Sequence, residues 1–284
     1  MNQETPGPPG ISFDFDGKNI LVTGAGAGIG RAIADAFHAA GGSVFAAEID
    51  EGLCSDLEAS GMIPIEGDVC APDFPAMAAA RIEQAGGKLD VLVNNVGHFV
   101  HPRPFSMLTN AQANEVLDVN LGQLLRMTSM MLPLLRKAAP GSSIVNVTSI
   151  EAYRGIPGCS VYAAAKAGIA GFTKSLALEL GPEGIRVNDI APETTDTPQV
   201  PLDFMIPPES RVHEDKWIPL GRLGRPEDCA GAALYLASPL ASWVTGTAIH
   251  VDGGALAAAG WTRTQDGEWT VVPLVTGNGI RIPS

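Results

Sequence analysis

Short apolar runs alternate along the chain with longer stretches in which apolar residues recur at three- and four-residue steps. The short runs have the length and β-branched content of buried strands, and the longer stretches have the periodicity of helices. The short runs predict seven strands, at Asn19–Thr23, Ser43–Ala47, Met62–Glu66, Val91–Asn94, Ser143–Thr148, Arg186–Ile190 and Ala248–Val251. The longer stretches predict helices at Gly28–Ala40, Glu51–Ala59, Phe74–Ala85, Ala111–Lys137, Val161–Leu180 and Glu227–Ala237.

Strands that alternate with helices are typical of a parallel sheet with helices on both faces. We therefore predict an α/β fold over residues 13–254, a single Rossmann-like doubly wound domain with a seven-stranded parallel sheet flanked by helices. Residues 1–12 are rich in Pro and Gly and are expected to form a flexible leader. The irregular, proline-containing stretch 194–223 is expected to be a substrate loop, and residues 255–284 a C-terminal tail.

Charge and hydropathy restrict the class of partner. The 284 residues include 18 Lys and Arg against 31 Asp and Glu, so the formal net charge is −13. Nucleic-acid binding needs a basic face and is therefore not expected. No apolar run reaches the roughly 18–20 residues that span a bilayer, and residues 1–12 lack the apolar segment of a signal peptide. We expect a cytoplasmic protein without a membrane partner.

Neither the cysteines nor the histidines have the spacing of a metal site. The cysteines are scattered without any Cys-x-x-Cys spacing, at Cys54, Cys70, Cys159 and Cys229. This scatter argues against disulfides and thiolate ligands and favours reduced, partly buried thiols. His98 and His101 offer two imidazoles, but no carboxylate or cysteine stands at ligand spacing from them. We therefore predict no metal site.

A glycine-rich turn follows the first predicted strand. Gly24, Gly28 and Gly30 lie between the end of that strand and the start of a helix. Such a turn leaves backbone N–H groups free at a helix N-terminus, where the helix dipole also favours an anion. The turn therefore fits the pyrophosphate of a dinucleotide, and a tight turn without a ligand is the alternative.

Glu48 ends the second predicted strand, 20 residues after Gly28. An acid at this place accepts hydrogen bonds from the adenosine ribose hydroxyls and repels a 2′-phosphate. The neighbouring positions that could supply a compensating cation hold Ala27 and Ile49. The sequence therefore predicts NAD rather than NADP, unless Glu48 is simply a solvated acid at a strand end.

Two further segments follow strands at the carboxyl edge of the sheet, where ligands bind in open α/β folds. They are Asp68 with Val69, and the Asn94–Gly97 segment. Asp68 is placed to meet an adenine amino group, and Gly97 allows the backbone to approach a ligand closely. Ordinary turn chemistry explains both segments equally well.

Tyr162 and Lys166 carry the strongest catalytic pattern, because their i, i+4 spacing puts them on one face of a predicted helix. A tyrosine exchanges a proton with an alcohol or ketone oxygen when a cation lowers its pKa from about 10. Thirteen residues earlier, Ser149 follows a strand, where its hydroxyl can hold the substrate oxygen. Asn120 lies inside a predicted helix, which asparagine disfavours, and a water that hydrates Lys166 would explain it. The alternatives are chance spacing for Tyr162 and Lys166, ordinary strand-end hydrogen bonding for Ser149, and a structural kink for Asn120.

With these residues identified, the sequence resembles the short-chain dehydrogenase/reductase family from Thr23 to about Gly254. The matching segments are TGAGAGIG at 23–30, DV at 68–69, NNVG at 94–97, VNL at 119–121, IVNVTS at 144–149, YAAAK at 162–166, RVNDIAP at 186–192, GRLGRPED at 221–228 and VTGTAIHVDGG at 244–254. The resemblance implies a tetrad of Asn120, Ser149, Tyr162 and Lys166, with Tyr162 as acid/base and Lys166 also binding the nicotinamide ribose.

Together with the residues above, the resemblance gives the full set of expected cofactor contacts. They are Gly24, Gly28, Ile29, Gly30, Glu48, Asp68, Val69, Asn94, Gly97, Tyr162, Lys166, Thr195 and Thr197. The chain departs from the family at Glu193, which replaces a usual glycine and puts a charge near the nicotinamide. The resemblance also implies a homotetramer, in which we expect the tail to cross a subunit interface.

The substrate loop is rich in large apolar residues. They are Val200, Leu202, Phe204, Met205, Ile206, Trp217 and Ile218. An apolar lid beside a polar centre suits a secondary alcohol or ketone on a hydrophobic, alicyclic, steroid- or terpenoid-like body, and packing of an ordered loop is the alternative. A 3-oxoacyl thioester reductase is the rival enzyme, although Glu48 and the acidic charge oppose the NADPH and basic docking patch it would need. A catalytically silent NAD-binding protein is the rival from another class.

Overall fold

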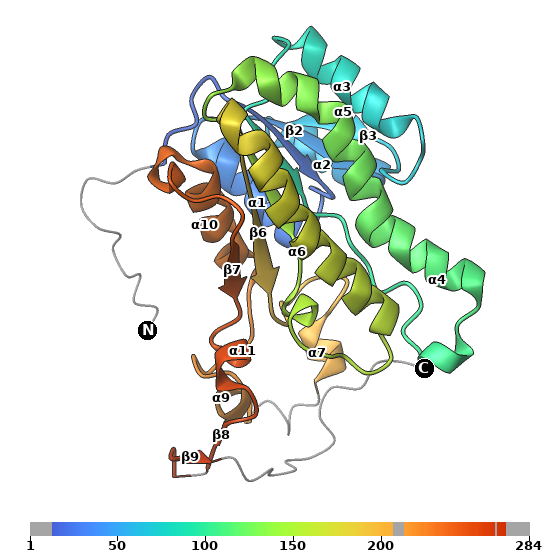
Figure 1. Cartoon of the computed structure of the whole chain (residues 1–284), viewed down its shortest axis with the longest axis vertical. Helices are drawn as coiled ribbons and strands as arrows, with labels where there is room; N and C mark the ends of the chain where they lie inside the picture. The colour runs from blue at the N-terminus through green and yellow to red at the C-terminus, as the bar shows by residue number, and fades with distance from the viewer. Residues whose placement is uncertain (1–12, 207–212, 265, 271–284) are drawn as a thin grey trace.

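The computed structural model describes residues 13–206, 213–264 and 266–270. The expected α/β fold is confirmed: one parallel seven-stranded sheet has the order β3-β2-β1-β4-β5-β6-β7 (Figure 1). The strands are β1 (Asn19–Thr23), β2 (Ser43–Glu48), β3 (Ile63–Glu66), β4 (Val91–Asn94), β5 (Ser143–Val147), β6 (Arg186–Pro192) and β7 (Ala248–Val251). Each prediction is right to within two residues at either end.

The strand order reverses beside β1, which pairs with β2 on one side and with β4 on the other. Chain connections leave such a reversal point in opposite directions, so they open a crevice at the carboxyl ends of the strands. In Figure 1 the arrowheads of β6 and β7 point toward the short helices α7 (Leu202–Met205), α9 (Glu214–Trp217) and α11 (Ala255–Ala258).

Helices cover both faces of the sheet. One layer holds α1 (Gly28–Ala39), α2 (Glu51–Ala59) and α10 (Pro226–Ala237), and the other holds α3 (Phe74–Gln84), α5 (Gln123–Ala138) and α6 (Ser160–Leu180). Alternate side chains of a strand point to opposite faces. In β1, Ile20 and Val22 therefore join the core under α1, and Leu21 joins the core under α5 and α6.

The single helix predicted at Ala111–Lys137 is wrong in one respect. It is α4 (Asn110–Leu117), a π-helical turn η2 (Asp118–Gly122) and α5. Within η2 the side-chain Nδ2 of Asn120 donates to the carbonyl of Val116 at 2.9 Å. This bond competes with the regular backbone ladder, which is a recognised way for asparagine to disturb a helix.

The stretch 194–223, whose role as a substrate loop stays a prediction, contributes to a core of its own. Leu202, Ile206 and Ile218 are buried together with Ile150 and Leu223. These apolar side chains therefore pack the loop onto the domain, which is the alternative given above for its apolar residues. The side chains of Phe204 and Met205 lie outside the described set.

The described part of the tail forms α11 and an antiparallel pair, β8 (Thr262–Arg263) and β9 (Trp269–Thr270). Here β8 lies beside α9 of the same chain. Residues 1–12 and 271–284 lie outside the described residues, so the leader and the interface role of the tail stay predictions.

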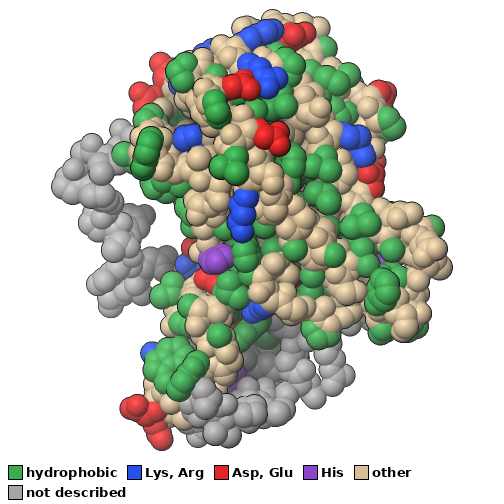
Figure 2. Space-filling model, viewed as in Figure 1, with side chains coloured by type: hydrophobic (Ala, Val, Ile, Leu, Met, Phe, Trp, Pro, Cys, Tyr) green, Lys and Arg blue, Asp and Glu red, His purple; other side chains and the backbone are tan. Residues whose placement is uncertain are grey.

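On the face drawn in Figure 2, the Lys and Arg side chains stand apart from one another, with acidic side chains between them. Among the described residues, no helix combines the length and apolar character needed to cross a bilayer.

Candidate active site

The glycine turn between β1 and α1 has the geometry of a phosphate cradle. Gly28 has φ +55°, a left-handed conformation that favours glycine. A Cβ added to Gly30 would lie 2.0 Å from the carbonyl oxygen of Gly24, so only a hydrogen fits there. Ala27, the N-cap of α1, offers no side-chain hydrogen bond. The first N–H groups of α1 are therefore left for an anion such as a pyrophosphate, with Ile29 in the first turn.

Glu48 holds this turn in place from the end of β2. Its Oε2 accepts the N–H of Gly26 at 2.8 Å, and its Oε1 accepts the N–H groups of Ile49 and Asp50 at 2.9 and 3.2 Å. A carboxylate has about four lone-pair positions, so roughly one remains for a ribose hydroxyl. Gly26 was not among the expected contacts. A Cβ at this position would lie 2.6 Å from Oε2 of Glu48, so the close approach of the carboxylate requires a glycine. The additional glycine in the TGAGAGIG segment was the signal for it.

The end of β4 contributes through its backbone and through a neighbour. The buried Asn94 side chain turns inward, where Nδ2 donates to Thr128 at 3.0 Å and to Asn146 at 2.9 Å. Asn95, which the sequence reasoning missed, donates from Nδ2 to the carbonyl of Thr23 at 2.9 Å. Asn95 therefore ties β4 to the glycine turn, and Asn94 supports the sheet beneath it.

Asp68 and Val69 lie after β3 at the same edge. The Oδ1 of Asp68 accepts the N–H of Cys70 at 2.8 Å, which is turn chemistry, while the side chain itself is exposed. Val69 is buried in the core beside it.

Tyr162 and Lys166 lie one turn apart on α6, and both are buried. The Nζ of Lys166 is 5.6 Å from the centroid of the Tyr162 ring and donates to the carbonyl of Val147 at 3.0 Å. A Cβ added to Gly97 would lie 2.7 Å from this Nζ and 2.9 Å from Oδ1 of Asn120. Gly97 therefore leaves the space in which Lys166 and Asn120 approach each other.

Asn120 and Ser149 complete the group. Asn120 accepts the N–H of His98 at 3.0 Å and donates to the His98 carbonyl at 2.9 Å, so it anchors the segment after β4. Ser149 lies just past β5 and caps η3 (Ile150–Ala152), where its Oγ accepts the N–H of Glu151 at 3.2 Å. Ser149 also lies close enough to Tyr162 to lower the pKa of its hydroxyl. The fold thus brings all four predicted tetrad residues to one edge of the sheet.

Burial dominates the ionisation of this group. It raises the pKa of Tyr162 above its usual range, and the nearby Ser149 hydroxyl acts in the opposite direction. Burial also lowers the pKa of Lys166 to about 8. We expected a nearby cation to lower the pKa of Tyr162. In this structure desolvation is the larger effect, and the Lys166 amine faces the carbonyl of Val147.

The substrate loop begins over the glycine turn. A Cβ added to Gly28 would lie 3.1 Å from Cγ2 of Thr197, so this threonine closes over the cradle. Thr195 is buried and donates from its hydroxyl to the carbonyl of Glu193 at 2.8 Å. Thr197 therefore lies against the glycine turn, and the contacts of both threonines with a nicotinamide stay predictions.

The opposite wall of the site is apolar. The Phe99 and Tyr162 rings lie with their centroids 4.5 Å apart. A small cavity opens here, lined by Phe99, His101, Leu108, Val116, Gly158, Cys159, Val161 and Tyr162. Its polar member, His101, forms an ion pair of 2.8 Å with Glu115. The cavity measures about 10 Å³, which is close to the space that one water molecule needs.

Among the described residues, no three His, Cys, Asp or Glu side chains gather in a way that could hold a metal ion. All four cysteines carry free thiols, three of them buried.

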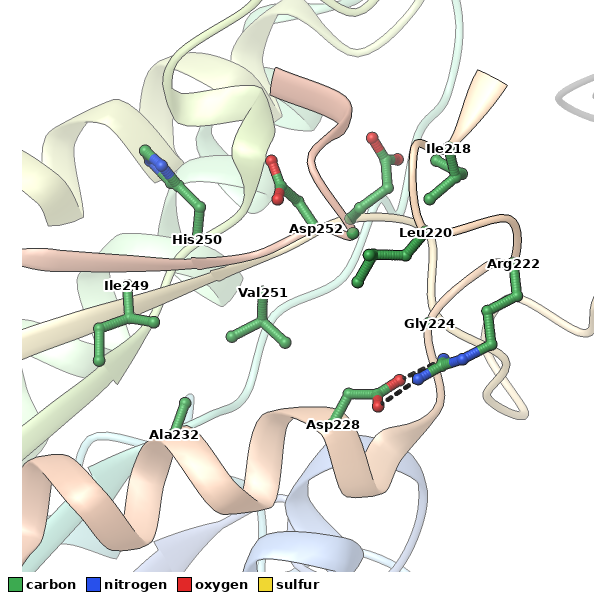
Figure 3. Close-up of a pocket in the computed structure, with 12 residues that line it drawn as sticks. Ile218, Leu220, Arg222, Gly224, Asp228, Ala232, Ile249, His250, Val251 and Asp252 are labelled. Carbon is green, nitrogen blue, oxygen red and sulfur yellow. Dashed lines mark hydrogen bonds and ion pairs between the residues drawn. The ribbon is translucent and has the colours of Figure 1, made fainter. Parts of the chain in front are cut away.

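A separate cavity of about 350 Å³ lies between β7, α10 and the end of the substrate loop. Figure 3 shows Ile249 and Val251 pointing toward Ala232 of α10, with an Arg222–Asp228 ion pair of 2.7 Å at the rim. Part of its lining lies on the α10 face of the sheet, whereas Tyr162 and Lys166 lie on the α6 face. Glu193 and His250 also line the cavity, and the ring centroid of His250 lies 4.7 Å from that of Tyr153.

Comparison with known proteins places this geometry among nicotinamide enzymes. A family model described as enoyl-(acyl carrier protein) reductase matches residues 24–255. The chain is 38% identical over 246 residues to a 3-oxoacyl-[acyl-carrier-protein] reductase of Thermotoga maritima, covering 84% of this chain and 98% of the relative. It is 36% identical over 250 residues to an L-rhamnose 1-dehydrogenase (NAD(P)(+)) of Sphingomonas, covering 84% and 96%. A solved 7α-hydroxysteroid dehydrogenase, complexed with NADH and 7-oxo glycochenodeoxycholic acid, aligns with TM-score 0.78 and 33% identity over 85% of this chain and 95% of that one.

Proposed function

The chain belongs to the short-chain dehydrogenase/reductase family, and we propose that it is an NAD-dependent dehydrogenase acting on a hydrophobic secondary alcohol. As a family member it is an oxidoreductase that acts on CH–OH or keto groups with a nicotinamide dinucleotide. The proposed substrate is an alicyclic, steroid- or terpenoid-like alcohol or its ketone. The observation that carries the substrate class is the apolar wall of Phe99, Val116 and Cys159 around the Tyr162 ring.

In the proposed mechanism the dinucleotide supplies the hydride acceptor when it is bound. Tyr162 takes the proton of the alcohol hydroxyl, and Ser149 holds the same oxygen by a hydrogen bond. Lys166 stabilises the ionised tyrosine by its charge and would hold the nicotinamide ribose when the dinucleotide is bound. Asn120 keeps the His98 segment in place by the two bonds of its side chain, and the carbonyl of Val147 holds the Lys166 amine.

Cofactor preference rests on Glu48. Its carboxylate lies at the end of β2 with no cation beside it, since Ile49 follows and Ala27 stands in the turn. A 2′-phosphate there would meet like charge. The double change Glu48→Ser with Ile49→Arg is expected to move the preference toward NADP by more than about tenfold, or about 1.4 kcal/mol. A wild-type enzyme that already turns over faster with NADPH would overturn this part of the proposal.

The substrate class is tested with a panel of alicyclic, steroid and acyl alcohols and of sugars, each assayed with NAD and with NADP. We expect the highest kcat/KM for a cyclic hydrophobic alcohol with NAD. Turnover of polar sugars in preference to such alcohols would refute the hydrophobic class.

A 3-oxoacyl thioester reductase is the second candidate, and the 38% identity to such an enzyme favours it. That activity uses an acidic carrier as substrate, which a chain of net charge −13 is poorly suited to attract. Efficient NADPH-dependent reduction of a 3-oxoacyl thioester, with no turnover of cyclic alcohols, would decide for this candidate.

A further inference from the structure

Arg154 stands between two carboxylates from different parts of the chain. Its Nη2 lies 2.9 Å from Oε1 of Glu151, three residues earlier, and 2.7 Å from Oε2 of Glu193 at the end of β6. The Nε of Arg154 also donates to Glu151, at 3.3 Å. The guanidinium thus joins the segment after β5 to the start of the substrate loop, and we call this contact the Arg154 bridge.

Glu193 is unusual in its burial and in its position. It is only 7% exposed, and its Oε1 also accepts the N–H and the hydroxyl of Thr194, each at 2.8 Å. A buried carboxylate is costly unless it is paired and hydrogen-bonded, and Arg154 supplies the counter-charge. The bridge therefore explains how a glutamate is tolerated where the family usually has glycine: its charge is directed at Arg154.

The Arg154 bridge is connected to Ser149 through Glu151. The backbone N–H of Glu151 donates to Oγ of Ser149, and Arg154 holds the side chain of the same Glu151. An N–H bound to a hydroxyl oxygen occupies one lone pair and leaves the O–H free to turn toward another acceptor. The hydroxyl of Ser149 lowers the pKa of Tyr162. Loss of Arg154 would release Glu151 and with it the orientation of Ser149.

We propose that Arg154 and Glu193 are positioning residues, which act on the reaction through Ser149 by fixing the short segment between β5 and α6. This inference rests on the proposed function, because it assigns a task to Ser149 in alcohol oxidation. It also gives Glu193 a specific task in this chain.

The decisive experiment is a double-mutant cycle in kcat with Arg154→Ala, Ser149→Ala and the combined variant. We expect Arg154→Ala alone to lower kcat at least tenfold, with the affinity for NADH unchanged within about twofold. If Arg154 acts through Ser149, adding Arg154→Ala to Ser149→Ala lowers kcat by less than twofold further. Losses that multiply in the double variant overturn the proposal.

The pH profile gives a readout that simple destabilisation would not move. The nearby Ser149 hydroxyl lowers the pKa of Tyr162, so its loss shifts the rising limb of kcat to higher pH. Arg154→Ala and Ser149→Ala should shift that limb by the same amount, and Arg154→Lys should restore part of it. A limb that stays in place in Arg154→Ala refutes the positioning role.

Arg136→Ala is the matched control, because Arg136 forms an exposed two-pronged ion pair with Glu183 remote from the site. It should change kcat by less than twofold. Glu193→Gln keeps the shape of the side chain and serves if Arg154→Ala does not fold. Thermal unfolding of Arg154→Ala, Glu193→Gln and their combination tests the bridge without an activity assay. If the loss of stability in the combined variant equals the sum of the two single losses, the two residues do not interact and no bridge exists. A wild type that turns over no alcohol refutes the proposed function while this unfolding cycle still tests the bridge.

Discussion

Replacing Glu48 with glutamine should damage the glycine turn and relax cofactor choice at the same time. The carboxylate accepts three backbone N–H groups, one on Oε2 from the buried Gly26 and two on Oε1 from Ile49 and Asp50. Glutamine has a single acceptor oxygen. Whichever way the amide is turned, its NH2 group faces at least one N–H donor that then has no partner.

The size of the effect follows from this count. With the amide oxygen toward Ile49 and Asp50, the N–H of Gly26 is left unpaired in a buried place, which costs about 1–3 kcal/mol. A loss of about 2 kcal/mol lowers Tm by about 4–8 °C in a protein of this size. Removal of the negative charge also weakens repulsion of a 2′-phosphate. The ratio of the Kd values for NADP and NAD should therefore fall by about tenfold or more.

The assay combines thermal unfolding with fluorescence titration of NADH and NADPH. Glu51→Gln is the control, since it removes the same charge from an exposed position in the first turn of α2. It should change stability by less than about 0.5 kcal/mol and leave the ratio of affinities unchanged. If Glu48→Gln keeps the wild-type Tm and the wild-type ratio, Glu48 neither holds the turn nor selects the cofactor.

Further predictions concern the tetrad, the cradle and the tail. Tyr162→Phe should lower kcat about 10²–10⁴-fold with NADH affinity unchanged, and more than a tenth of wild-type activity would contradict its acid/base role. Gly30→Ala should abolish NADH binding and lower Tm, because the new Cβ would meet the Gly24 carbonyl at 2.0 Å, and normal binding in a titration would refute the cradle. Burial lowers the pKa of Lys166 to about 8, so above that pH the folded protein has released a proton that the unfolded chain still binds. The free energy of unfolding of wild type, measured relative to Lys166→Met, should therefore rise between pH 8 and 10. Truncation after Gly254 should weaken the expected tetramer or raise substrate KM with NAD affinity unchanged, and unchanged sedimentation with unchanged KM would remove the interface role of the tail.

Local patterns were enough to predict much of the fold and the edge of the sheet at which the proposed tetrad residues lie. The seven strands were predictable because strands of a parallel sheet are buried on both faces and form short continuous apolar runs, whereas burial under a helix repeats every three to four residues. The spacing of Tyr162 and Lys166 settled that they share a helix face, which the 3.6-residue turn requires. The glycines of the turn were recognisable because few other sequences allow a strand to enter a helix so tightly.

Side-chain direction and burial were decided only by the tertiary structure. Whether Asn94 faces the ligand edge or the interior depends on Thr128 and Asn146, which come from other elements. The pKa of Tyr162 depends on how much water the fold removes around it, so a neighbouring lysine in the sequence could not predict its direction.

The same distinction holds for the charged residues at the site. The sequence determined that acids stand at Glu48 and Glu193, where parallel strands end. Only the folded chain decided that Glu48 is occupied by three N–H groups and that Arg154, 39 residues before Glu193, neutralises the second acid. The physical reason is that periodicity is a property of neighbouring residues, whereas the partner of a buried charge is chosen by which distant segments the packed sheet and helices bring within hydrogen-bond distance.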